Sequence, residues 1–155
     1  VAYPPEKEID LAAEYPGKSG PVKWQSHLTV DEMGTVDLNV VLIKEKGVCG
    51  YALTEFESEK GQDVELRWGT VSATKLWLNG ELLLSTDNMF VPQRVAVRDR
   101  LRAGLNELLL CFHPALERAR EIEAAHGKRH LWNGDSARLY VRKAQYHFGW
   151  DWVRC

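Results

Sequence analysis

The stretch "TKLWLNGELLL", residues 74–84, decides the fold because it carries the clearest turn signal in the chain. Apolar residues stand on both sides of Asn79-Gly80. This dipeptide is preferred in two-residue type I′ turns, since both of its positions need a positive φ. The stretch therefore predicts an antiparallel β-hairpin.

Other short apolar runs lie on both sides of this hairpin, separated by turn residues. Alternation of apolar and polar residues with period two is typical of half-buried strands. The alternation is clear at residues 50–58 and 63–70 and partial at 34–43. A further strand pair is expected near 94–98 and 105–112, and the chain is expected to return to strand over 136–148.

One helix interrupts the strands near residues 114–126. Pro114 suits a first helical turn, Leu116, Ala119 and Ile122 form a narrow apolar stripe, and Gly127 suits the C-cap. Many short strands with one late helix predict an all-β protein, a jelly-roll β-sandwich. Residues 1–23, rich in Pro, Gly and charge, are expected to form an extended lead-in, and 24–155 a single β-sandwich domain.

The composition narrows the classes of partner. The chain has 155 residues, 27% of them charged, and a formal net charge of −2. Its basic residues are scattered among acids, which argues against nucleic acid, because phosphate binding needs a concentrated basic face. No apolar stretch is long enough to span a membrane, and no signal peptide is recognisable, so no membrane partner is expected and the compartment stays unassigned.

The cysteines and histidines do not form a recognisable metal motif. Cys49, Cys111 and Cys155 are dispersed, and the simplest interpretation is two strand thiols and one terminal thiol. A disulfide between Cys49 and Cys111 is an alternative in an oxidising compartment. His126 and His130 are four residues apart, but the expected helix end at Gly127 argues against a zinc site there. No cofactor is indicated, and a structural calcium ion is left open.

No catalytic motif or paired carboxylates can be recognised. A glycosidase needs two carboxylates across the scissile bond. Glu55, Glu57 and Glu59 alternate along one strand, as expected of a solvated face. The residues alone therefore favour a binding or interaction module over an enzyme.

The last third of the chain concentrates aromatic and polar residues, in "DNMF" (87–90), "WNGD" (132–135) and "RLYVRKAQYHFGWDW" (138–152). Such a mixture suits carbohydrate, because sugar rings stack on Trp and their hydroxyls bridge to carboxylates and guanidinium groups. The alternative is that Trp150 or Trp152 fills the core while Asp151 caps a neighbouring backbone. Physical reasoning alone leaves both interpretations open.

The motif R-K-x-Q followed by G-W-D-W resembles the end of the N-terminal sugar-binding domain of β-mannosidases in glycoside hydrolase family 2. The segments "LWLNGELL" (76–83), "DNMFVPQRVAV" (87–97) and "LRAGLNELLLCFHPALERAREIE" (101–123) fit the same family in order and spacing. The resemblance covers residues 74–152. It implies a jelly-roll, galactose-binding-domain-like domain beside a separate (β/α)8 barrel that carries both catalytic glutamates.

The resemblance also assigns roles to particular residues. It implies that Asp151 hydrogen-bonds sugar hydroxyls and that Trp150 helps to form the wall of the subsite. Trp152 and Arg142 would contact the sugar or support the loop. No residue of this chain is expected to be catalytic. The expected function is non-catalytic binding of a β-mannoside or another carbohydrate.

Other parts of the sequence depart from the family pattern. The family continues with Gly-Pro after W-D-W, whereas this sequence continues Val153-Arg154-Cys155. Residues 1–73 look more like an accessory β-sandwich module of large bacterial proteins. A fragment, a diverged relative and a composite of two sandwich sequences all fit. The alternative function is a protein-interaction or scaffolding module that docks through Trp150 and Trp152.

Overall fold

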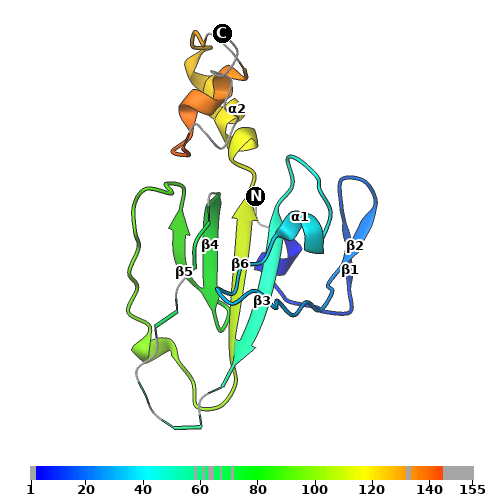
Figure 1. The fold of residues 1–155 in the computed structure, drawn as a ribbon, viewed down its shortest axis with the longest axis vertical. Helices are drawn as coiled ribbons and strands as arrows, with labels where there is room; N and C mark the ends of the chain where they lie inside the picture. Colours follow the sequence, from blue (N-terminus) through cyan, green and yellow to red (C-terminus); the bar gives the residue numbers. More distant parts are fainter. Residues whose placement is uncertain are drawn as a thin grey trace. The chain divides into compact units, whose positions relative to one another are not determined.

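The computed structural model describes residues 3–57, 59–60, 62, 65–66, 68–70, 72–131 and 134–144. Its helices and strands are, in chain order, η1 (Pro4–Glu6), β1 (Glu14–Pro16), β2 (Pro21–Lys23), α1 (Leu38–Val41), β3 (Gly50–Phe56), β4 (Ala73–Leu78), β5 (Glu81–Thr86), η2 (Arg98–Arg100), β6 (Asn106–His113), α2 (Ala115–His126) and η3 (Ser136–Tyr140). The strands form two antiparallel sheets, and the helices are few (Figure 1). This arrangement confirms the all-β class.

The chain divides into two compact units, Val1–Val48 and Cys49–Cys155. The first contains the short hairpin β1–β2, in which Tyr15 stands opposite Val22 and Lys23 Nζ lies 3.2 Å from Glu14 Oε1. Residues 1–23, expected to be an extended lead-in, thus hold a small hairpin. The single sandwich domain over 24–155 stays a prediction.

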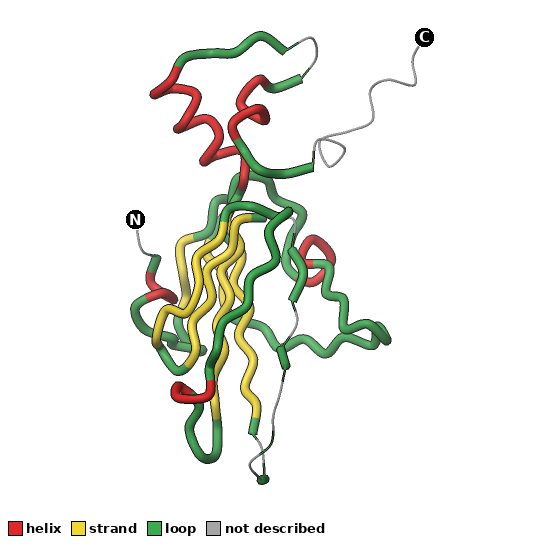
Figure 2. Tube along the Cα trace, turned by 90° about the vertical axis from the view of Figure 1, so that its left-hand side faces the viewer, coloured by secondary structure: helices red, strands yellow, loops and turns green. Residues whose placement is uncertain are grey.

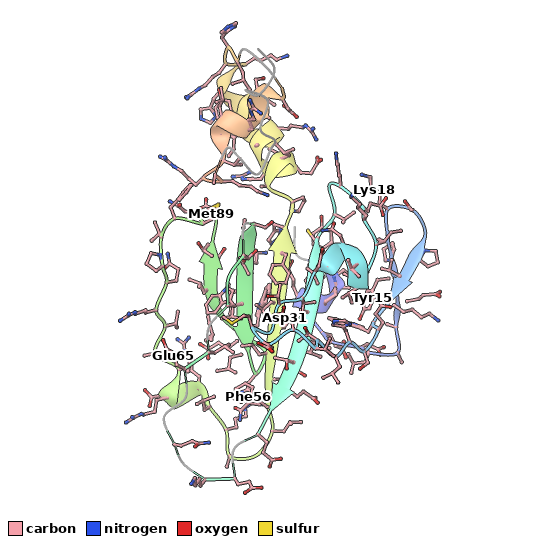
Figure 3. The ribbon with its side chains drawn as sticks, viewed as in Figure 1. Tyr15, Lys18, Asp31, Phe56, Glu65 and Met89 are labelled. Atoms are coloured by element: carbon pink, nitrogen blue, oxygen red, sulfur yellow. The ribbon has the colours of Figure 1, made fainter. Side chains whose placement is uncertain are left out.

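In the rest of the first unit, two aspartate side chains accept hydrogen bonds from backbone N–H groups. Asp31 (Figure 3) accepts hydrogen bonds from the backbone N–H groups of Met33 and Thr35, at 3.0 and 2.9 Å. These bonds, that from Thr35 foremost, lower the pKa of Asp31. Asp37 caps the four-residue helix α1 by accepting from Asn39 N at 2.9 Å. This cap explains why residues 34–43, which alternate only in part, form a short helix rather than a strand.

The second unit is built on a four-stranded antiparallel sheet with the order β3-β6-β4-β5 (Figure 1). The predicted hairpin is confirmed, since β4 and β5 flank Asn79 and Gly80, with φ values of 52° and 83°. β6 pairs with both β3 and β4 and is therefore an interior strand. Its continuous apolar run Leu108–Phe112 fits that position, because both faces of an interior strand can be covered.

The main hydrophobic cluster of this unit lies on one face of the sheet, and Trp77 and Leu109 are buried on the other. Leu76, Leu78 and Leu108 are each at most 3% exposed and form a cluster on adjacent strands. Residues that pack against this cluster are Phe56, Trp68, Leu83, Leu84, Val97, Leu101 and Leu110. Phe56 lies at the lower end of β3 in Figure 3. The sheet is therefore anchored by β4 and β6.

Three further predicted strands differ from the structure. Residues 94–97 are loop that leads into η2, although Val97 packs against the core cluster. The described residues of 63–70 also carry no strand. The prediction of a strand over 136–148 is wrong for Ser136–Tyr140, which form the 3-10 helix η3. Val97 reaches the core from a loop, and the Asp135 cap starts a helix at Ser136, so an apolar pattern at these residues did not require a strand.

The helix predicted near 114–126 is confirmed as α2, with Gly127 at its C-cap. Pro114 is its N-cap rather than its first residue. The chain leaves the sheet at the end of β6 and continues directly into α2 (Figure 2). None of the helices in the described ranges is long and apolar enough to cross a membrane.

Candidate functional site

The structure describes one of the four residues predicted to bind sugar. Arg142 is exposed and follows η3, whereas Trp150, Asp151 and Trp152 lie outside the described residues. The assignment of those three residues to the site stays a prediction.

The backbone around Arg142 is held beside the loop that follows β5. Asn88 and Arg142 form an isolated parallel β-bridge, and Met89 N donates to Arg142 O at 3.3 Å. Ala144 N points at Met89 Sδ from 3.1 Å (Figure 3). The segments 87–90 and 142–144, which are distant in sequence, are therefore brought together. Both were singled out by their mixture of polar and aromatic residues.

The loop itself is ordered by its asparagine. Asn88 Oδ1 accepts a hydrogen bond from Phe90 N at 3.0 Å, which closes an Asx turn. The turn leaves Phe90 61% exposed. An exposed aromatic ring thus lies two residues from the bridge to Arg142. This arrangement can present an apolar ring face and a guanidinium group to a ligand.

Lys143 adds a second cation next to Arg142 in the chain. Burial lowers the pKa of Lys143, because desolvation disfavours the charged ammonium group. The neighbouring Ala144 is buried, at 6% exposed. Arg142 and Lys143 therefore differ in environment: the first faces solvent and the second is partly covered.

Asp135 of the predicted sugar-type segment "WNGD" has a structural role in the described residues. It caps η3 by accepting from Ala137 N at 3.1 Å, and its Oδ2 lies 2.8 Å from Arg120 Nη2 of α2. The backbone hydrogen bond and then the Arg120 guanidinium lower the pKa of Asp135. Trp132 and Asn133 of the same segment lie outside the described residues.

Two further hydrogen bonds hold η3 against α2. Ser136 Oγ donates to Glu123 Oε1, and Tyr140 Oη donates to the carbonyl of Gly127, each at 2.5 Å. Arg129 also lies over the Tyr140 ring, 4.7 Å from its centroid. These contacts fix the start of the segment that leads to Arg142.

The carboxylates of β3 and its continuation behave as predicted. Glu55, Glu57 and Glu59 are all exposed. A solvated face is what their alternation indicated, and it is confirmed.

Sequence reasoning missed a cluster of Cys49, Cys111 and His113. Their ligand atoms all lie within 4.8 Å of one another. Cys49 and Cys111 are thiols in the structure. The available signal was the pair Cys111-x-His113, which places a sulfur and an imidazole on the same face of a strand.

A family model described as "Glycosyl hydrolase 2 galactose-binding domain-like" matches residues 50–155. Among curated proteins, Beta-mannosidase B of Thermothelomyces thermophilus is 51% identical over 77 residues, which are 48% of this chain and 9% of that protein. Beta-mannosidase B of Emericella nidulans is 47% identical over 88 residues, which are 54% of this chain and 10% of that protein.

A solved structure of Beta-D-Mannosidase from Dictyoglomus thermophilum is also similar. It is 33% identical with a TM-score of 0.49, and the match covers 66% of this chain and 11% of that one. The chain spans about a tenth of the length of the curated relatives it matches.

Proposed function

Because the chain belongs to the glycosyl hydrolase 2 galactose-binding domain-like family, we propose that it is a non-catalytic carbohydrate-binding domain. In this proposal it is the ancillary domain of a β-mannosidase-type hydrolase, and the match over residues 50–155 carries the proposal. The curated relatives are named β-mannosidases and are about ten times longer than the matched segment. The catalytic carboxylates and a (β/α)8 barrel would then belong to another domain.

The binding groups in this proposal are those of the Trp150-Asp151-Trp152 loop. Asp151 accepts hydrogen bonds from sugar hydroxyls, and Trp150 forms a wall against the apolar face of the ring. Trp152 and Arg142 support or extend this surface. The position of Arg142 supports such a role, because its backbone is tied to Met89 while its side chain stays exposed.

Titration of the chain with mannose and manno-oligosaccharides tests the proposal, with Trp fluorescence as the readout. Asp151→Asn is the test variant, and Asp99→Asn is the matched control because Asp99 is an exposed residue of η2. We expect millimolar binding that Asp151→Asn abolishes and Asp99→Asn leaves unchanged. Equal binding by both variants would contradict the role of Asp151.

A second measurement uses the longest natural reading frame that contains the chain, because a domain supplies only part of a shared subsite. We expect the frame to encode a barrel and to release nitrophenol from a nitrophenyl β-mannoside. Loss of a charge-assisted hydrogen bond in Asp151→Asn should lower kcat/KM by about 10- to 100-fold. A frame without a barrel would contradict the ancillary-domain proposal.

A protein-interaction module is the second candidate, and exposed apolar side chains in the first unit favour it. Leu28, Val30 and Met33 are 87%, 96% and 89% exposed. Large apolar groups exposed together are typical of contact surfaces. Light scattering at increasing concentration discriminates, since a monomer that binds mannosides supports the first function and a concentration-dependent oligomer the second.

A further inference from the structure

We propose that Cys49, Cys111 and His113 form a binding site for Zn²⁺. Cys111 and His113 are two residues apart on β6, so their side chains lie on the same face of the sheet. Gly50 of β3 stands opposite Phe112. Cys49, one residue earlier, therefore continues the register opposite His113, which brings the second thiol to the imidazole.

Each sulfur lies close to the imidazole of His113, but each is nearest to a different ring nitrogen. Cys49 Sγ lies 3.6 Å from His113 Nδ1, and Cys111 Sγ lies 3.5 Å from His113 Nε2. Tetrahedral zinc, bound to sulfur and nitrogen at its usual lengths, holds these atoms about 3.5 Å apart. A small turn of the ring would direct one nitrogen at the ion between both sulfurs. With one donor atom taken from each residue, the three atoms already lie within 4.8 Å of one another.

The chemistry of the donors favours zinc over harder cations. Two thiols and an imidazole are soft to borderline ligands, whereas Ca²⁺ and Mg²⁺ take oxygen. Two thiolates and a neutral imidazole also balance the double charge of Zn²⁺. This balance matters because Cys111 is fully buried, and an uncompensated charge there would be costly.

The strand register disfavours the competing disulfide between Cys49 and Cys111. Tyr51 is the residue directly opposite Cys111, so Cys49 is a diagonal neighbour. Diagonal neighbours in an antiparallel pair are about 7–8 Å apart, beyond the usual Cα separation of a disulfide. A metal ion spans this separation more readily than a direct sulfur–sulfur bond.

The site has three protein ligands and a route to solvent. Cys49 and His113 are only partly buried. Zinc sites with three protein ligands keep a fourth tetrahedral position for water or an incoming group. The ion would join the start of β3 to the last residue of β6, directly before α2. It would therefore restrain an edge strand and the point where the helix leaves the sheet.

The test substitutes cobalt for zinc in the full chain, on a Cys155→Ser background that removes the remaining thiol. Tetrahedral Co²⁺ with thiolate ligands gives a near-ultraviolet charge-transfer band and visible d–d bands. We expect both sets of bands to saturate at one equivalent and to disappear when Zn²⁺ is added. We also expect Zn²⁺ to raise the Tm, because an ion that binds only the folded state stabilises it.

Cys49→Ser is the decisive variant, because Cys49 is partly exposed and its replacement leaves the buried Cys111 in place. We expect Cys49→Ser and His113→Gln to lose the charge-transfer band and the Tm increase while keeping the circular dichroism of the parent. His126→Gln, an exposed histidine at the end of α2, should bind as the parent does.

Three results would overturn the zinc site. One is the absence of a thiolate–cobalt band in the folded parent. Another is an equally strong band in folded Cys49→Ser. The third is a mass lower by two hydrogens in protein purified with zinc, since that shows a disulfide in place of two metal-binding thiols.

Discussion

Asn79 combines a left-handed backbone with three side-chain hydrogen bonds. Its φ is 52°, its Nδ2 donates to Arg100 O and Asn106 Oδ1 at 3.0 Å, and its Oδ1 accepts from Glu107 N at 3.1 Å. Asn106 is itself buried and donates to the carbonyls of Arg102 and Gly104. The turn of the β4–β5 hairpin is therefore fastened to the start of β6.

Replacement of Asn79 separates the contribution of the left-handed backbone from that of the side-chain hydrogen bonds. Asn79→Ala loses the hydrogen bonds and strains the turn, so we expect the free energy of unfolding to fall by about 2–3 kcal/mol. Asn79→Gly restores the positive φ without the bonds and should recover about 1 kcal/mol of that loss. Urea denaturation followed by circular dichroism measures both. Equal losses would show that backbone strain contributes nothing.

One of the elements that sequence patterns missed is η3, and its interactions explain why. Residues 136–148 alternate like a strand, but Asp135 caps Ser136–Tyr140 and Ser136 bonds to Glu123 of α2. These contacts involve α2, a separate element earlier in the chain, so alternation within residues 136–148 could not reveal them. The Asn79-Gly80 hairpin and α2, in contrast, were predictable because their turn and cap residues act locally.

The lowered pKa of Asp135 makes the α2–η3 contact sensitive to acid. A carboxyl with a depressed pKa in the folded state stabilises that state above its unfolded pKa, about 3.8, and this contribution is lost as pH falls through the folded value. The contribution is small, because Arg120 and Asp135 are exposed by 52% and 37%.

The thermal stability of Asp135→Asn is compared with that of the parent between neutral pH and about pH 3. Asn keeps the cap but not the charge. We expect the variant to be slightly less stable at neutral pH and the difference to shrink as the pH falls below 3.8. Thermal unfolding at each pH measures it, and a constant difference would show that the carboxylate charge plays no part.

At the scale of the molecule, large buried apolar residues concentrate in the second unit. Leu76, Leu78 and Leu108 form its core, whereas Pro5 is the only buried residue described in the first unit. We expect amide hydrogens of β4 and β6 to exchange slowest and those of β1 and β2 to exchange close to the unfolded rate. Mass spectrometry of exchanged peptides measures this. Comparable protection in β1 and β6 would contradict it.

The prediction of the sugar site depended on a family motif rather than on local sequence patterns. Trp150, Asp151 and Trp152 were identified through a family motif, because physical reasoning from the sequence alone slightly favoured core packing over ligand binding. The bridge between Asn88 and Arg142 could not be predicted, since it joins segments more than fifty residues apart without any local signal. The proximity of Cys49 to His113 could not be predicted for the same reason, because it follows from strand register alone.

The strand order has a consequence for how the sheet assembles during synthesis. β3 is made first of the four, but its one partner among the described strands is β6, which is made last. β4 and β5 can close their hairpin as soon as both have emerged, while β3 waits for a partner some fifty residues downstream. Long-range strand pairing is slow and leaves edges exposed. A nascent chain that stalls before β6 therefore carries an unpaired strand, and chaperones that bind extended apolar segments should find it at β3.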